Sequence, residues 1–272
     1  MLDLGANEHV RVVAAGSSSG DPVVLIHGWG CSAYFFRRLL PAVAATGRRA
    51  IAIDLRGHGG SSKPTAAGAY TSEAMRAFAE RTLDALNIGR AHIVAHSLGG
   101  GVAIDLAVAQ PSRVRSLTLL APVGLAPLRF VLLARLATPP LAASLVPYAV
   151  PRWSIPMILR AVNGADGRWA SRDVDEYWAP TADPAFALAL RALLHEYRFT
   201  PRTDAELAAI VSPALVILGD RDLLVRSRRS AKRVDGRHGW STVMVERAGH
   251  VLAEEVPEGV LQALLPHLDR CR

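Results

Sequence analysis

The fold of this chain is decided by one stretch, Ala91-His92-Ile93-Val94-Ala95-His96-Ser97-Leu98-Gly99-Gly100-Gly101. Its apolar and β-branched first half predicts a short buried strand, and the run that continues Val102-Ala103-Ile104 predicts a helix. Between them, Ser97 lies on a sharp turn that pushes its hydroxyl out of the top of a sheet. Only small neighbours fit such a turn, because strand and helix approach closely there. Ala95 replaces the first glycine of the G-x-S-x-G pattern, which a methyl group still allows.

A nucleophilic serine is one of two interpretations of this stretch; the other is a buried serine in an ordinary strand–helix connection. Leu98 opens the predicted helix, so its backbone N–H has no partner within the helix. That N–H points at any charge that develops beside Ser97. The rest of the chain decides between the two interpretations.

Composition favours one compact globular unit. The chain has 272 residues, half of them apolar, which is enough for one large α/β domain with an insertion. The 31 Lys and Arg outnumber the 24 Asp and Glu, but no basic run is interleaved with aromatic residues, so we expect no nucleic-acid partner. The two cysteines are far apart in sequence and indicate no disulfide framework.

The N-terminus has no basic segment followed by an apolar one, so no signal peptide is predicted. The longest apolar stretch, residues 136–151, contains four prolines and is too short to cross a bilayer. These features predict a cytoplasmic protein without stable membrane insertion.

Strands and helices alternate along the chain before and after a long interruption. Continuous apolar runs predict buried strands, with helices between them, at residues 22–26, 48–55, 91–96, 114–120, 214–218 and 241–245. This order predicts a doubly wound, mostly parallel sheet flanked by helices. Residues 123–203 contain helical patterns and no clear strand, so we expect a helical lid insertion there and an α/β core made of residues 1–122 and 204–272.

Residues 106–165 contain no Asp or Glu. Such a stretch favours either an acidic substrate or, more simply, an apolar lid whose arginines reach solvent. The larger lid side chains are candidates for pocket lining, and the sequence does not separate these from ordinary packing; they are Trp153, Trp169, Tyr177, Trp178 and His195.

A serine hydroxyl needs a base within hydrogen-bond reach, itself oriented by a carboxylate. Ser97, Asp222 and His250 each follow a predicted strand, and the carboxyl ends of parallel strands share one edge of a sheet. Asp220 is the alternative acid, but it abuts the strand end and is better placed to cap the turn. Trp29, in the turn His27-Gly28-Trp29-Gly30, offers a second backbone N–H beside that of Leu98.

With these motifs in this order, the sequence resembles the α/β-hydrolase superfamily, in particular its lid-bearing serine esterase-like branch. The matching segments cover the chain outside the lid and are His27-Gly28-Trp29-Gly30, Asp54-Leu55-Arg56-Gly57-His58-Gly59, Ala95-His96-Ser97-Leu98-Gly99-Gly100, Gly219-Asp220-Arg221-Asp222 and Gly249-His250. The resemblance implies Ser97 as nucleophile, Asp222 as orienting acid and His250 as general base. It also implies an oxyanion hole formed by Trp29 and Leu98, with no cofactor and no metal.

Serine in the nucleophile position favours acyl transfer, because similar dehalogenases and epoxide hydrolases carry an aspartate there. We therefore expect a hydrolase of carboxylic esters or lactones whose substrate is small to medium in size and apolar. One alternative is a hydrolase of carbon–carbon bonds next to a ketone, which needs a polar group such as a lid arginine or His195. Another is a binding or receptor-like protein without turnover.

Overall fold

The computed structural model describes residues 1–128, 131–139, 150–164 and 167–271. Its centre is a seven-stranded sheet in the order β3-β5-β4-β6-β7-β8-β9, in which β3 is antiparallel to β5 and the other neighbours are parallel. The strands are β3 (Val12–Ala15), β4 (Pro22–Ile26), β5 (Arg49–Ile53), β6 (Ala91–His96), β7 (Val114–Leu120), β8 (Ala214–Gly219) and β9 (Trp240–Val245). A separate two-stranded ribbon pairs β1 (Leu2–Asp3) with β2 (His9–Val10).

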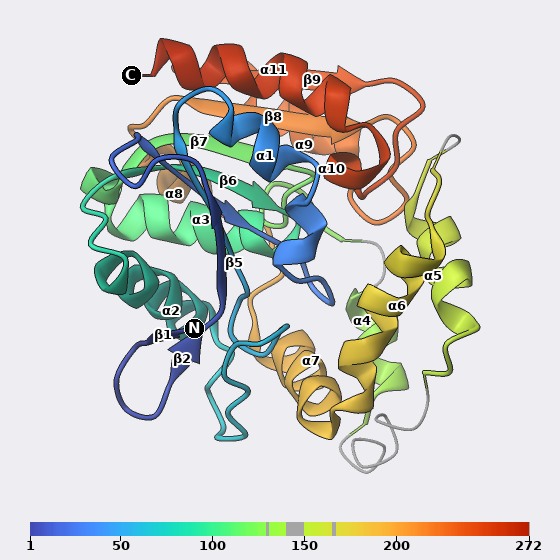
Figure 1. Cartoon of the computed structure of the whole chain (residues 1–272). Coiled ribbons are helices and arrows are strands. Elements are labelled where there is room, and N and C mark those ends of the chain that lie inside the picture. Colours follow the sequence, from blue (N-terminus) through green and yellow to red (C-terminus); the bar gives the residue numbers. More distant parts are fainter. Residues whose placement is uncertain (129–130, 140–149, 165–166, 272) are drawn as a thin grey trace.

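Helices cover both faces of the sheet and create two cores (Figure 1). One face carries α1 (Leu39–Ala44), α10 (Leu252–Glu255) and α11 (Pro257–Arg270). The other carries α2 (Ser72–Ala85), α3 (Leu98–Ala109), α8 (Asp204–Ala208) and α9 (Ser227–Val234). Strands β6 and β8 are buried along their whole length, as expected for parallel strands covered on both sides. The predicted doubly wound sheet is therefore confirmed.

Two helical segments are interrupted, in each case near a proline. The segment between β4 and β5 is a 3-10 turn, Ala33–Phe36, followed by α1. Pro41 has no N–H to donate to the preceding turn, and its ring excludes the carbonyl four residues earlier, so one continuous helix cannot form. The C-terminal helical segment is divided into α10 and α11, and Pro257 occupies the first turn of α11.

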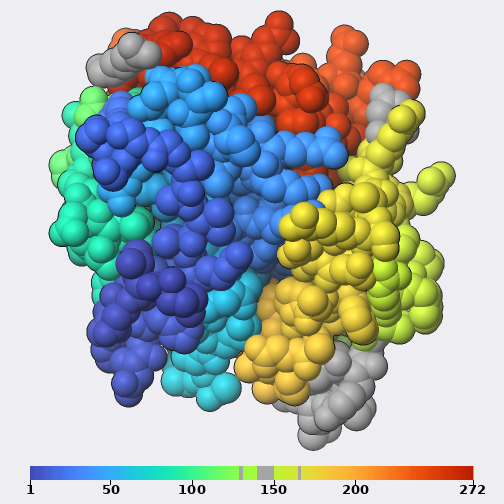
Figure 2. All heavy atoms as spheres, in the orientation of Figure 1, coloured from blue at the N-terminus to red at the C-terminus, as the bar shows by residue number. Residues whose placement is uncertain are grey.

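The chain leaves the sheet after β7 and returns to it before β8; we call residues 123–203 the insertion. Its described residues form no strand, and its helices are α4 (Val131–Ala137), α5 (Ser154–Val162), α6 (Ser171–Trp178), the 3-10 turn Ala179–Ala182 and α7 (Pro184–Glu196). In Figure 2 the segment of the helices α5 to α7 forms a lobe, yellow-green to orange, beside the blue N-terminal part of the core. The two ends of the insertion meet, because the N–H of Arg202 donates to the carbonyl of Gly124 at 2.7 Å.

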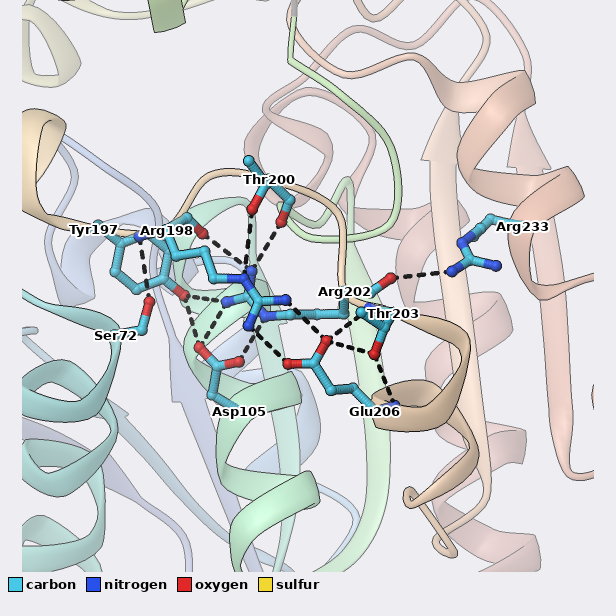
Figure 3. Close-up of polar contacts among 9 residues, drawn as sticks. All are labelled: Ser72, Asp105, Tyr197, Arg198, Thr200, Arg202, Thr203, Glu206 and Arg233. Carbon is cyan, nitrogen blue, oxygen red and sulfur yellow. Dashed lines mark hydrogen bonds and ion pairs between the residues drawn. The ribbon is translucent and has the colours of Figure 1, made fainter.

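A buried ion pair fixes the returning end of the insertion to α3 (Figure 3). The guanidinium of Arg202, which is 1% exposed, donates to both carboxylate oxygens of Asp105 at 2.6 Å. The hydroxyl of Tyr197 also contacts this pair, 3.3 Å from Asp105 and 3.1 Å from Arg202. Because α3 begins directly after Ser97, this anchor ties the insertion to the helix that carries the serine turn.

None of the helices in the described part of the chain is both long and apolar enough to cross a membrane.

Candidate active site

Ser97 lies on a strained turn between β6 and α3. Its backbone has φ +50° and ψ −114°, a conformation that costs a residue with a side chain on the order of 1–3 kcal/mol. The turn is held by its neighbours, since the N–H of Ser97 donates to the carbonyl of Leu120 and the carbonyl of Ser97 accepts the N–H of Val123, both at 2.9 Å. The sheet therefore stabilises the strain that exposes the serine side chain.

Glycines surround this turn because backbones and rings press against it. A Cβ atom on Gly28 would lie 2.7 Å from Nδ1 of His96, and one on Gly99 would lie 2.5 Å from the carbonyl oxygens of Ile26 and His27. On Gly100 it would meet Pro122 at 2.7 Å. Ala95, by contrast, lies inside β6 and is fully buried. The alanine that departs from the glycine pattern is thus accommodated as a strand residue.

The structure brings the three predicted polar side chains into one hydrogen-bonded line. Oγ of Ser97 lies 2.9 Å from Nε2 of His250, and Nδ1 of His250 lies 2.7 Å from Oδ2 of Asp222. The other carboxylate oxygen of Asp222 accepts the N–H groups of Leu224 and Val225 at 2.8 and 2.9 Å. An imidazole held in this way can take the serine proton, and the carboxylate stabilises the imidazolium that results.

Asp220, the alternative acid, takes a different position. It is exposed, and its backbone N–H donates to the carbonyl of Val245. The structure thus separates the two aspartates: Asp222 contacts His250, and Asp220 ends the strand.

Two backbone N–H groups are free beside the serine. Among the described residues, neither the N–H of Trp29 nor that of Leu98 has an acceptor within the protein. The carbonyl of Gly28 is turned toward Nδ1 of His27, 2.8 Å away, and Nε2 of His27 accepts the N–H of Leu55 at 3.0 Å. Since Nε2 is an acceptor, Nδ1 carries the proton and donates to Gly28. The planar peptide then directs the N–H of Trp29 the opposite way.

His96 supports the other side of the site. Its Nε2 donates to the carbonyl of His250 at 3.0 Å, and its ring stacks on Phe35 with centroids 4.3 Å apart. Burial lowers the pKa of His96 well below the usual value, so this ring is neutral and acts as a fixed support for the His250 turn.

Asp54 and His58, both in the loop after β5, contact the backbone of nearby loops. The carboxylate of Asp54 accepts the N–H groups of Ala33 and Gly60 at 2.6 and 2.8 Å, which pins the loop after β5. Burial, together with the nearby ring of His27, lowers the pKa of His58 to about 3. Nδ1 of His58 donates to the carbonyl of Arg56 at 3.1 Å. Both side chains thus contact loop backbone at the sheet edge rather than Ser97.

An apolar cavity of about 380 Å³ opens on Ser97 and His250. Its walls are side chains from the insertion and the loops of the sheet edge, for example Leu159 of α5 and Phe186 of α7. No Arg or Lys is among the described residues that line it. Apart from Trp29, His96, Ser97 and His250, the polar side chains among its described lining residues are those of Cys31, Tyr177 and Thr181.

Comparison with known proteins places this arrangement in a family. A sequence profile of the alpha/beta hydrolase fold family matches residues 21–255. The chain belongs to this family. A curated relative, the dihydrolipoyllysine-residue acetyltransferase component of the acetoin cleaving system of Pseudomonas putida, is 30% identical over 266 residues, 95% of this chain and 66% of the relative. The chain thus spans just under two thirds of that relative's length.

Two solved structures share the fold of this chain. A membrane phospholipase A, described as a bacterial virulence factor, has a TM-score of 0.79 and 26% identity over 99% of this chain and 87% of that chain. A 2-hydroxy-6-oxo-6-phenylhexa-2,4-dienoate hydrolase from Rhodococcus sp. strain RHA1 has a TM-score of 0.77 and 22% identity, and the match covers 97% of this chain and 96% of that chain.

The insertion places its large side chains in different environments. Tyr177 lines the cavity, whereas Trp153 is 69% exposed and Trp178 donates from Nε1 to the carbonyl of Val150. Trp169 packs against a small cluster formed by α5 and α6. His195 lies away from the cavity, with Nε2 3.1 Å from both Oγ1 and the carbonyl of Thr138.

A polar chain below the cavity was not anticipated from the sequence. Tyr177 of α6 donates to Oε2 of Glu254 at 2.7 Å, and Arg37 bridges Glu254 and Asp173. Burial raises the pKa of Glu254 despite the nearby Arg37. Arg37 and Glu254 lie 217 residues apart in the sequence, and no helical or strand periodicity relates them. The helical i, i+4 spacing of Asp173 and Tyr177 was the only signal in the sequence.

The remaining candidate ligands do not gather into a metal site. Within the described residues, no three or more His, Cys, Asp or Glu side chains are arranged to hold a metal ion. Cys31 and Cys271 are both free thiols.

Proposed function

We propose that this hydrolase cleaves carboxylic esters or lactones of small to medium apolar substrates, with Ser97 as nucleophile, His250 as general base and acid, and Asp222 as orienting acid. The observation that carries the proposal is the 2.9 Å contact between Ser97 and Nε2 of His250 at the floor of an apolar cavity. A hydroxyl paired with a base can attack a carbonyl, and an apolar wall favours an apolar acyl or alcohol group.

The proposed course has two halves. Nε2 of His250 takes the proton of Ser97 as Oγ attacks the substrate carbonyl, and the oxyanion is stabilised by the N–H groups of Trp29 and Leu98. His250 then protonates the leaving alcohol, which gives an acyl-enzyme. Water activated by His250 releases the acid and restores Ser97.

The insertion serves in this proposal as a lid, because residues 123–203 supply more than half of the described residues that line the cavity. An enclosed apolar wall excludes bulk water, which strengthens the hydrogen bonds to a developing oxyanion. Residues 123–203 would thus determine substrate choice, and the core, residues 1–122 and 204–272, would supply the reacting groups.

Carbon–carbon bond hydrolysis next to a ketone is the alternative, and the cavity argues against it. The dienoate in the name of the Rhodococcus relative is a carboxylate, and burying a carboxylate is costly unless a cation pairs with it. Arg135 and Arg191, both on insertion helices, donate to backbone carbonyls, and neither lines the cavity. A cavity wall without a cation is better suited to an uncharged ester than to a carboxylate.

The test is hydrolysis of p-nitrophenyl esters of graded chain length by the wild type and by Ser97→Ala. We expect the wild type to hydrolyse these esters at a rate that depends on their chain length, and Ser97→Ala not to hydrolyse them. Turnover of a 2-hydroxy-6-oxo-dienoate with no ester hydrolysis would favour the carbon–carbon reaction. Labelling of Ser97 by a fluorophosphonate without turnover of either substrate would favour a binding protein on this fold.

A further inference from the structure

The turn that carries His250 is in direct backbone contact with the end of α5. A Cβ atom on Gly249 would lie 2.5 Å from the carbonyl carbon of Asn163, and one on Gly164 would lie 2.7 Å from the backbone nitrogen of Gly249. The N–H of His250 donates to the carbonyl of Val162 at 2.8 Å. We call the contact of residues 162–164 with residues 249–250 the lid seam.

One carboxylate spans the lid seam. Oε1 of Glu255 accepts the N–H of Gly164, and Oε2 accepts the N–H of Gly249, both at 2.8 Å. Glu255 is the last residue of α10, and its own N–H donates to the carbonyl of Val251. The carboxylate therefore joins three elements: the insertion, the His250 turn and α10.

We propose that Glu255 is a positioning residue for His250, and that through it the end of α5 is part of the catalytic machinery. The imidazole of His250 makes its two contacts, to Ser97 and Asp222, only if the backbone of its turn is fixed. Glu255 fixes that turn at Gly249, the residue before His250, and at the same time holds the insertion against it. The inference rests on the proposed function, since it assigns Glu255 a part in the same reaction.

This arrangement connects the substrate cavity to the base. Val162, whose carbonyl accepts the N–H of His250, also lines the cavity, as do Ile158 and Leu159 of the same helix. A substrate that packs against α5 therefore contacts the same helix whose last residue, Val162, accepts the backbone N–H of His250. Binding and alignment of the base are coupled through the lid seam.

The first test is Glu255→Gln. Glutamine keeps the size of the side chain, but its amide has one acceptor oxygen and an NH₂ group that cannot accept an N–H. One of the two bonds is lost, so we expect kcat for a p-nitrophenyl ester to fall about tenfold or more, with KM little changed. The rate at which a fluorophosphonate labels Ser97 should fall by a similar factor, because that rate depends on the base.

The matched control is Glu258→Gln, which changes an exposed glutamate in the first turn of α11. It should leave kcat, the labelling rate and the melting temperature at the wild-type values. Gly164→Ala provides a second variant from the insertion side, because its methyl group would meet the carbonyl of Arg247 and the carboxylate of Glu255. It should slow labelling of Ser97 in the same way.

Amide hydrogen exchange separates this inference from the proposed function. In Glu255→Gln, exchange should accelerate in peptides that contain Gly164 or Gly249 and stay unchanged in α2 and α3. Faster exchange with an unchanged labelling rate, or no change in either, would overturn the positioning role. A wild type that neither labels nor hydrolyses esters would overturn the proposed function, while exchange would still decide whether Glu255 bridges the seam.

Discussion

His250 and Asp222 face each other so that each uses one atom for the contact: Nδ1 of the imidazole lies 2.7 Å from Oδ2 of the carboxylate. Oδ1 of Asp222 is occupied by two backbone N–H groups from the turn that follows. The loop therefore fixes the carboxylate through Oδ1, and Oδ2 remains for the imidazole of His250. This contact orients the ring so that its Nε2 faces Ser97.

Asp222→Asn should keep this shape but favour the wrong tautomer of His250, because the amide can donate to Nδ1. We expect kcat for an ester substrate to fall about 10³- to 10⁴-fold. Asp220→Asn, two residues earlier on an exposed side chain, is the control and should keep wild-type kcat. Equal losses in the two variants would contradict the assignment of Asp222.

His27→Ala should weaken the oxyanion hole proposed for Trp29 and Leu98 without changing Ser97. The ring holds the carbonyl of Gly28, and releasing it allows the Gly28–Trp29 peptide to rotate. Loss of one oxyanion donor costs on the order of 10²–10³ in turnover, and partial misalignment should approach that range. Steady-state kinetics should show the loss in kcat rather than in KM, and circular dichroism should confirm that the variant is folded.

Arg202→Met should destabilise the whole fold, because it leaves the carboxylate of Asp105 without its partner. Breaking a buried pair costs about 3–5 kcal/mol. The exposed pair of Arg198 and Glu206, in the same part of the structure (Figure 3), is the control, and Arg198→Met should cost only about 0.2–1 kcal/mol. Urea unfolding measures both free energies, and similar values would contradict the anchoring role of Arg202.

Stability should fall on acidification because buried histidines are held neutral. Burial, with the nearby ring of His27, lowers the pKa of His58 from the usual 6.5 to about 3, so below pH 6.5 the unfolded chain binds a proton that the folded chain does not. Between pH 6.5 and pH 3 this residue removes about 1.4 kcal/mol of stability per pH unit.

His58→Gln should therefore flatten the decline of the unfolding free energy between pH 6.5 and pH 5 by about 2 kcal/mol in total. The same substitution at His238, which is exposed, should leave the slope as it is in the wild type. A parallel decline in the wild type and His58→Gln would show that His58 is not held neutral by the fold.

The sheet and the serine site were predictable because they depend on local signals. Apolar runs mark β4 and β7 to the residue, and residues after strand ends converge by the geometry of a parallel sheet. Ser97, Asp222 and His250 could be chosen before their distances were known for that reason. The choice of Asp222 over Asp220 also followed from position, because Asp220 directly follows the strand end, whereas Asp222 lies two residues further along the loop and contacts His250.

The cavity and the lid seam could not be predicted in the same way. The insertion is apolar on several sides, so periodicity did not show that Tyr177 faces the cavity while Trp153 faces solvent. Glu255 accepts the N–H of Gly164, which is 91 residues away in the sequence, and no local sequence pattern predicts such a contact. His195, a candidate for a polar group near the substrate, bonds to Thr138 instead.

Three glycines in succession, Gly99 to Gly101, form the first turn of α3. Each is less favourable in a helix than alanine by about 0.8–1 kcal/mol, so this segment has little tendency to become helical in isolation. Glycines are required there because the carbonyls of Ile26 and His27, the ring of Pro122 and the hydroxyl of Tyr197 leave no room for a Cβ atom. A peptide of residues 91–109 should thus be a random coil in water, and during refolding the reactive serine should acquire its geometry only after the surrounding strands have assembled.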